Sequence, residues 1–343
     1  MDARLVVLIL VTLMSHFMVL TKVPKYKMNN GREIPAIALG TFLGFDEHGV
    51  TQSENKMLRD VVIQAIDLGY RHFDTAAVYN TEAELGEAVR ITVAEQTVSR
   101  DEVFITTKLW NTRHRKGQVM KALEESLRQL GLDYVDLYLM HWPIGLNDDY
   151  TPTNTDYMET WRAMEDAVEA GYAKSIGLSN FNKQQLKRVI DEGNIKPAVL
   201  QIEIHPQLVQ EELVQYAQSQ GIVVMGFSPF GSMVTRFGVN YTGLRFNDPV
   251  LRQIAERHNK TTAQVVLRWF VERKIIPMPK TIRYSRLIEN IDIFDFQLDE
   301  EEIEMISQFN RNVRFTAPTF WQNHPHYPFD KVDNPIEDPF TKI

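Results

Sequence analysis

The chain has 343 residues, 44% of them hydrophobic and 24% charged, a composition ordinary for a globular protein with a substantial core. The net charge is -8 at pH 7 and no basic stripe occurs, so a nucleic-acid partner is not expected. The absence of cysteine excludes disulfides, thiolate catalysis and cysteine-ligated zinc.

The N-terminus predicts a secretory leader. A short charged start, residues 1–4, precedes the apolar run Leu5–Leu20, as in a signal peptide. Because a spanning helix needs about 20 apolar residues, no stable membrane span is expected. We expect residues 1–22 to be a signal peptide of a secreted protein. A helix packed on the fold of a cytoplasmic protein is the alternative. Glycosylation sequons that begin at Asn240 and Asn259 agree with secretion.

A small hairpin is expected next, because Tyr26–Met28 and Glu33–Pro35 flank a turn at Asn29–Gly31. Short apolar runs then alternate with helical patterns such as Lys56–Leu68 and Val119–Leu130. The runs predict strands at Ala36–Leu39, His72–Asp74, Val103–Lys108, Val135–His141, Ser175–Ser179, Val199–Glu203, Val223–Phe227 and Ile275–Met278. This alternation predicts an α/β protein with βαβ units and a parallel sheet.

The repeats favour a closed (β/α)8 barrel, with residues 23–343 as one domain. An open doubly wound sheet that binds a dinucleotide normally carries G-x-G-x-x-G after its first strand, and the stretch Leu39–Gly44 lacks that spacing. A barrel places functional groups at the C-terminal ends of its strands. Polar residues gather at those ends: Asp74, Lys108, His141, Ser179, Asn180, Gln201, Glu203 and Lys280.

Four ionisable side chains are expected to converge at adjacent strand ends. Asp74, Lys108 and His141 end the second, third and fourth strands, and Tyr79 follows Asp74 by five residues. The set suggests proton transfer to an oxygen. Tyrosine has a reference pKa of about 10, which a nearby ammonium lowers. Asp74 would keep Lys108 charged, and His141 would orient a carbonyl. Taken singly, each residue also fits a structural role, such as an ion pair between Lys108 and Asp74.

Three stretches of the chain closely resemble the aldo-keto reductase family. They are Gly69–Tyr79, Leu137–Pro143 and Met278–Thr281, the last followed by Arg286, Glu289 and Asn290. The resemblance runs from about Pro24 to Tyr327. It implies NADPH-dependent reduction of aldehydes and ketones to alcohols on a (β/α)8 barrel.

The resemblance also implies roles for single residues. Tyr79 would be the general acid, tuned by Lys108 and Asp74, and His141 would orient the carbonyl. Cofactor-binding residues would be Thr41, Ser179, Asn180, Gln201, Phe227, Ser228, Pro229, Phe230, Gly231, Ser232, Lys280, Thr281, Arg286, Glu289 and Asn290. Within this set, Lys280, Thr281 and Arg286 match the positions that grip the 2′-phosphate, which favours NADPH over NADH. Phe227 would stack on the nicotinamide, where the family usually has tyrosine.

By the same resemblance the substrate pocket has aromatic walls, from Phe42, Trp110, Trp142, Phe320 and Trp321. Such walls suit apolar carbonyl compounds. A proline-rich tail after the last helix should lie over the barrel mouth, with His324 and His326 on the surface and not as metal ligands. Together with the leader, this pocket resembles secreted insect 3-dehydroecdysone reductases.

Two alternatives belong to other classes. The first is a non-enzymatic barrel subunit, crystallin-like or regulatory, which loss of one of the four ionisable residues would support, and none is lost. The second is a metal-dependent barrel hydrolase, which needs clustered histidine and carboxylate ligands at strand ends. Only His141 and His205 lie near such ends, so no metal site is expected. We expect a monomer.

Overall fold

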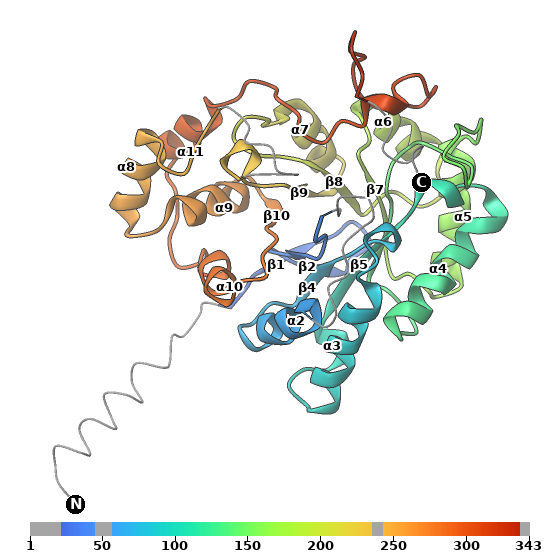
Figure 1. Ribbon diagram of the computed structural model, residues 1–343, viewed down its shortest axis with the longest axis horizontal. Coiled ribbons are helices and arrows are strands. Elements are labelled where there is room, and N and C mark those ends of the chain that lie inside the picture. Colours follow the sequence, from blue (N-terminus) through green and yellow to red (C-terminus); the bar gives the residue numbers. More distant parts are fainter. Residues whose placement is uncertain (1–21, 45–56, 235–242, 337–343) are drawn as a thin grey trace, which may run out of the picture.

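The computed structural model describes residues 22–44, 57–234 and 243–336. The predicted leader, apart from Lys22, and the sequon at Asn240 lie outside these residues. Within them, eight parallel strands form a barrel surrounded by helices (Figure 1). No helix in the described part of the chain is long and apolar enough to span a membrane.

The strands run in chain order around the barrel. They are β3 (Leu39–Gly40), β4 (His72–Asp74), β5 (Phe104–Leu109), β6 (Leu137–Met140), β7 (Ile176–Ser179), β8 (Val199–Glu203), β9 (Val223–Phe227) and β10 (Ile275–Met278). The ring closes where Ala38 N–H and Gly40 N–H donate to the carbonyls of Pro277 and Pro279, each at 3.1 Å. The predicted barrel is confirmed. The predicted first strand overlaps β3 only at Leu39.

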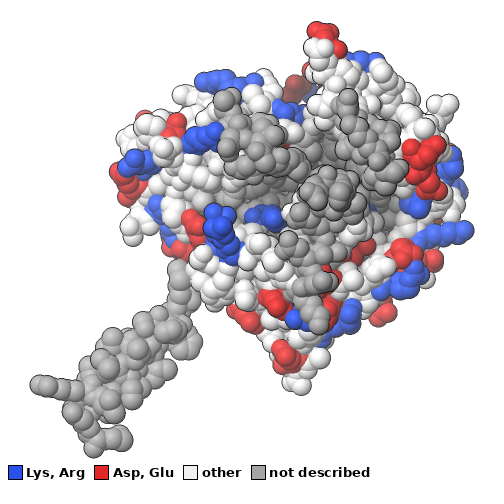
Figure 2. Space-filling view, in the orientation of Figure 1, with Lys and Arg blue, Asp and Glu red and all other residues white. Residues whose placement is uncertain are grey.

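Helices cover the outside of the barrel (Figure 1), and charged side chains of both signs are spread over that outer surface (Figure 2). They are α2 (Met57–Asp67), α3 (Glu82–Ala94), α4 (Lys116–Leu130), α5 (Tyr157–Glu169), α6 (Lys183–Glu192), α7 (Glu211–Ser219), α8 (Pro249–His258), α9 (Thr262–Glu272), α10 (Tyr284–Ile291) and α11 (Glu300–Ser307). The predicted stripe of α4 is buried at Val119, Leu123 and Leu127, because every third or fourth residue meets the sheet. The layer between sheet and helices is the main core.

The predicted hairpin is present as β1 (Lys25–Lys27) and β2 (Glu33–Pro35). Met28 and Ile34 join the apolar cluster inside the barrel, which also contains Leu139 and Met225. The hairpin therefore packs on the barrel interior. The opposite ends of the strands carry the polar residues and form the candidate site.

A tail, residues 312–336, follows α11 and crosses the C-terminal ends of the strands. It contains one short 3-10 helix, Thr319–Trp321. Trp321 packs in a cluster with Trp142, Ile144 and Leu146, which all follow β6. The tail predicted over the barrel mouth is thus present, and it has little regular structure.

Candidate active site

The charged centre of the site is the buried side chain of Lys108. We call Lys108, together with Asp74, Tyr79, His141 and Gln201, the floor of the site. Lys108 Nζ donates to Asp74 Oδ1 at 2.5 Å, to the Thr75 carbonyl at 2.8 Å and to Tyr79 Oη at 3.4 Å. Gln201 Nε2 donates to the other oxygen of Asp74 at 2.7 Å. Parallel neighbouring strands bring these side chains to one edge, so the predicted convergence is present.

His141 completes the floor. Its ring lies 5.7 Å from that of Tyr79 and 5.2 Å from that of Trp110, both edge-on. Its carbonyl accepts from the Asn180 amide at 3.0 Å, and within the described part of the chain its buried Nδ1 has no hydrogen-bond partner. Burial, followed by the charge of Lys108, lowers the pKa of His141 well below its ordinary value. The imidazole is therefore neutral at pH 7.

The protonation of the floor differs in one respect from the sequence-based prediction. Burial raises the pKa of Tyr79 and outweighs the lowering effect of Lys108, so the net shift is upward. The prediction of a lowered pKa was wrong because it counted the ammonium but not the loss of water. Burial acts to lower the pKa of Lys108, but Asp74 and Tyr79 raise it above its ordinary value. Lys108 is therefore charged and Tyr79 is protonated at neutral pH.

The residues predicted to hold a nicotinamide lie beside the floor. Asn180 follows β7 with a left-handed backbone, φ 61°, and its amide also donates to Ser179 Oγ at 3.2 Å. Its buried Oδ1 has no hydrogen-bond partner among the described residues. Thr41 follows β3 and donates its hydroxyl to the Asp74 carbonyl at 3.0 Å. Phe227 is half-buried at the end of β9.

The segment 228–232 turns sharply after β9. Ser228 and Gly231 have φ values of +58° and +48°. A Cβ on Gly231 would lie 2.7 Å from the His205 ring, so this turn requires glycine. Ser232 is buried, and its hydroxyl bonds to Gln207 and, at 2.9 Å, to the Leu244 carbonyl. Ser232 thus anchors the turn by its side chain, while Pro229 and Phe230 belong to the same segment.

The predicted phosphate-gripping residues gather where β10 leads into α10. Lys280 lies beside Gly40 of β3, and both Lys280 and Arg286 are exposed. The Thr281 hydroxyl accepts from Arg283 N–H at 3.0 Å and shapes the turn. Further along the helix, Glu289 is half-buried and Asn290 is buried. The helix N-terminus and the two cations make this corner suited to an anion.

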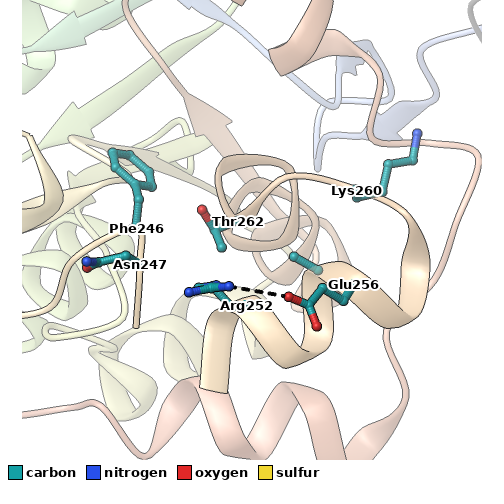
Figure 3. Close-up of a pocket in the computed structure, with 7 residues that line it drawn as sticks. Phe246, Asn247, Arg252, Glu256, Lys260 and Thr262 are labelled. Carbon is teal, nitrogen blue, oxygen red and sulfur yellow. Dashed lines mark ion pairs between the residues drawn. The ribbon is translucent and has the colours of Figure 1, made fainter. Parts of the chain in front are cut away.

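A hollow of about 450 Å³ lies between α8 and α9. Figure 3 shows Arg252 and Glu256 of α8 paired at its edge, with Lys260 directed away from that pair. The hollow is bordered by Phe246, whose ring lies 5.4 Å from that of Phe230. Phe246 therefore packs against the predicted cofactor segment. No sequence motif pointed to Phe246, because it lies in a loop far from any of them.

Aromatic rings stand above the floor, as predicted. We call Trp110, Trp142, Phe320 and Trp321, together with the rest of the tail, the wall. Trp321 lies 6.1 Å from Trp110 and 6.3 Å from Trp142, and Phe320 packs on Trp321 at 4.9 Å. Phe42 packs on the Tyr79 ring itself, at 4.9 Å.

The wall is attached to the barrel through Glu203, at the end of β8. Glu203 is fully buried, and it accepts Phe315 N–H at 2.9 Å, Thr316 N–H at 2.8 Å and His205 Nε2 at 3.2 Å. Burial acts to raise the pKa of this carboxyl, but these partners hold it below its ordinary value. The sequence placed Glu203 at a strand end but did not indicate its role.

One tail prediction was wrong. His324 is buried, 4% exposed, and its Nε2 lies 3.2 Å from the Gly145 carbonyl. It anchors the tail to the loop after β6, while His326 is partly buried against Tyr157 at 5.0 Å. Neither forms a metal site: among the described residues no cluster of ligating side chains suits a metal ion.

The chain resembles known proteins over most of its length. A model described as "Aldo/keto reductase family" matches residues 36–311. Aldo-keto reductase AKR2E4 of Bombyx mori is 45% identical over 305 residues, covering 89% of this chain and 98% of the relative. Aldo-keto reductase family 1 member A1 of Gallus gallus is 40% identical over 322 residues, covering 88% and 96%.

Solved structures agree with these matches. Bombyx mori AKR2E4 in complex with NADP has a TM-score of 0.85 and 44% identity, covering 90% of this chain and 100% of the other. AKR2E5 complexed with NADPH has a TM-score of 0.89 and 41% identity, covering 94% and 98%. Polar side chains that converge at the strand ends of a parallel barrel define a barrel enzyme. The chain belongs to the aldo/keto reductase family.

Proposed function

We propose that this protein reduces apolar aldehydes and ketones to alcohols with NADPH, and that Tyr79 donates the proton. The observation that carries the proposal is the contact between Lys108 Nζ and Tyr79 Oη, 3.4 Å. An ammonium can only donate hydrogen bonds, so the phenol oxygen accepts here. The phenolic proton is therefore left for another acceptor, such as a carbonyl oxygen above the floor.

Each residue of the floor has a different role in the proposed reaction. Bound NADPH supplies the hydride for the carbonyl carbon. Tyr79 gives its proton to the carbonyl oxygen, and charged Lys108 stabilises the phenolate that results. Asp74 keeps Lys108 charged and in place through the 2.5 Å ion pair. Neutral His141 is suited to orient the substrate oxygen and not to act as the acid, because its pKa is lowered.

The residues present fit a nicotinamide dinucleotide. The unpartnered buried Oδ1 of Asn180 is an acceptor suited to the carboxamide NH₂. Phe227 offers a flat apolar face, and Phe246 offers another beside Phe230. Lys280 and Arg286 at the start of α10 suit a 2′-phosphate. Similar chains were solved with NADP and NADPH, which supports the choice of cofactor.

The wall supports the choice of substrate class. Trp110, Trp142, Phe320 and Trp321 offer apolar surface for a hydrophobic carbonyl compound, including steroid ketones such as 3-dehydroecdysone. A panel of aliphatic aldehydes, aromatic aldehydes and ecdysteroid ketones tests this, with NADPH absorbance as the readout. Equal turnover of small polar and large apolar carbonyls would contradict it.

The role of Tyr79 is tested by Tyr79→Phe, which removes one hydroxyl. We expect kcat to fall by about 10²-fold or more, since a positioned acid is lost. NADPH binding, followed by fluorescence, should be retained. Wild-type turnover in this variant would remove Tyr79 from the mechanism.

Arg286→Ala tests the cofactor. A charge-assisted contact is worth about 1.5–3 kcal/mol, so NADPH should bind roughly ten- to hundredfold more weakly, while NADH binding changes little. An equal loss for both cofactors would show that Arg286 does not contact the 2′-phosphate.

We also propose that residues 1–22 are a signal peptide and that the protein enters the secretory pathway. The sequon at Asn259 agrees with this, because Asn259 is exposed at the C-terminal cap of α8. The test is expression in insect cells, with N-terminal sequencing and glycosidase treatment of cells and medium. An intact Met1 in the cytosol, with no shift on deglycosylation, would overturn the localisation and leave the enzymatic proposal untouched.

A further inference from the structure

Thr81 occupies the N-cap position of a helix, but its side chain does not cap that helix. It is the N-cap residue of α3, where a threonine hydroxyl ordinarily accepts a hydrogen bond from the helix backbone. Here the side chain makes no cap hydrogen bond. Instead, the fully buried hydroxyl lies 3.1 Å from Thr41 Oγ and 3.1 Å from Thr75 Oγ. The hydroxyl of Thr81 is therefore directed to the floor and not to its own helix.

The direction of this hydroxyl chain follows from counting protons. Each hydroxyl has one proton, and a carbonyl only accepts. Thr41 Oγ donates to the Asp74 carbonyl, so it must accept from Thr81. Thr81 must in turn accept from Thr75. The chain runs from Thr75 through Thr81 and Thr41 to the Asp74 carbonyl, and Thr81 is its central link.

The chain closes the loop that carries Tyr79. Thr75 and Thr81 lie six residues apart, at the two ends of this loop, and their hydroxyls join its ends. The Thr75 carbonyl also accepts from Lys108 Nζ at 2.8 Å. Thr75 therefore takes part both in the hydroxyl chain and in the contacts of the Lys108 ammonium. A shift of the loop would change the 3.4 Å contact between Lys108 and Tyr79.

We infer that Thr81 is a positioning residue, which holds the Tyr79 phenol against Lys108 through the Thr75–Thr81–Thr41 hydroxyl chain. The inference rests on the proposed role of Tyr79 as proton donor. Within the described structure the Thr81 hydroxyl bonds to Thr41 and Thr75, so it acts on Tyr79 only through the loop. Loss of the Thr81 hydroxyl would leave the ion pair of Lys108 and Asp74 in place. The position of the Tyr79 phenol would then be less well fixed.

Thr81→Val tests this, since it keeps the shape and removes the hydroxyl. A misplacement near 1 Å lowers turnover by up to about 10²-fold, so we expect kcat to fall roughly tenfold or more. KM for NADPH should change by less than about twofold, because Thr41 keeps its hydrogen bond to the Asp74 carbonyl and the phosphate-gripping residues lie elsewhere. Thr81→Ser keeps the hydroxyl and should restore most of kcat. Wild-type kcat in Thr81→Val, or no rescue by serine, would overturn the inference.

Thr92→Val is the matched control. Thr92 is also buried in α3, and its hydroxyl bonds to the Ala88 carbonyl at 3.0 Å, away from the floor. We expect this variant to lose stability without losing kcat. In a Tyr79→Phe background, Thr81→Val should cost nothing further, since the hydroxyl it positions is gone. An equal loss of kcat in both backgrounds would mean a general structural role and would overturn the inference.

A measurement without turnover separates this inference from the proposed function. Ultraviolet difference titration, wild type minus Tyr79→Phe, reports the pKa of Tyr79. Because contact with Lys108 opposes the rise in this pKa, Thr81→Val should raise it further, and Thr92→Val should not. An unchanged pKa would contradict the inference. A wild-type protein that reduces no carbonyl would contradict only the proposed function.

Discussion

The floor and the wall of the site are built in different ways. The floor residues Asp74 and Lys108 lie on neighbouring strands, fully or almost fully buried, with every ammonium proton of Lys108 directed at an acceptor. The wall residues Phe320 and Trp321 lie on a tail with little regular structure and meet their neighbours mainly through ring contacts. Hydrogen bonds between strands thus fix the position of the floor, while packing and a few backbone contacts fix the wall.

This difference indicates where the molecule tolerates change. A buried charged pair is sensitive to any substitution, because removing one partner leaves the other charge unpaired. An aromatic wall tolerates a change of shape, since ring contacts are individually weak and not strongly directional. We therefore expect floor variants to change the rate of chemistry and wall variants to change the choice of substrate.

The largest effect is expected from Lys108→Met, which removes the charge of the floor. Without the ammonium the phenolate of Tyr79 is not stabilised, and kcat should fall by about 10²–10³-fold. The carboxylate of Asp74 is left buried without a cation, which costs about 3–5 kcal/mol of stability. Stopped-flow NADPH consumption and thermal melting measure the two losses. A variant with a stable fold and normal kcat would contradict our description of the floor.

A smaller effect is expected where wall and barrel meet, in Glu203→Gln. The N–H groups of Phe315 and Thr316 bind different oxygens of Glu203, and in glutamine an NH₂ group, which cannot accept, replaces one of these oxygens. Since a hydrogen bond to a charged group contributes about 1.5–3 kcal/mol, amide hydrogen exchange at the tail should accelerate roughly tenfold or more. Exchange at β4 and β5 should stay unchanged. Uniform acceleration over the whole chain would show that Glu203 supports the barrel and not the wall.

Trp321→Ala should have a milder effect, on selectivity. Aromatic pairs contribute about 0.5–1.5 kcal/mol each, so kcat/KM for a large apolar ketone should fall roughly two- to tenfold. The value for a small aliphatic aldehyde should stay nearly constant, because the floor is untouched. Comparison of the two substrates with the same enzyme sample provides the control. Equal losses for both would place Trp321 in support of the floor.

The smallest effect is expected from pH. The pKa of His141 is lowered well below its usual value and that of Tyr79 is raised. Neither group therefore gains or loses a proton in the pH range between the two pKa values. Since the ordinary values are about 6.5 and 10, kcat/KM for reduction should vary little between about pH 6.5 and 9. A descending limb with a midpoint near pH 6.5–7 would assign the proton transfer to His141 instead.

The sequence was sufficient to predict the barrel and the floor, for a physical reason. Short apolar runs ending in Asp74, Lys108 and His141 have no simpler explanation than buried strands with polar ends. Parallel pairing then brings those ends together. The Tyr79 pKa was predicted in the wrong direction because its sign depends on burial, which a motif does not report.

The supports of the site were out of reach of sequence reasoning. Thr41 was assigned to the cofactor only through the family resemblance, and its contact with Thr81, 40 residues away, has no sequence signature. Glu203 was visible at a strand end, but its partners are backbone N–H groups of Phe315 and Thr316, which have no sequence signature. His324 was misplaced because a histidine beside a proline in an irregular tail gives no sign of burial.

The attachment of the tail at both of its ends has an evolutionary consequence. Glu203 holds residues 315 and 316, while Gln185 and Asn182 hold the carbonyls of His326 and Pro328 at 2.9 and 3.1 Å. Between these attachments the stretch meets the barrel through His324 and the ring contacts of Trp321. We therefore expect sequence changes elsewhere in this stretch, in evolution or by design, to alter the choice of substrate more than the reaction chemistry.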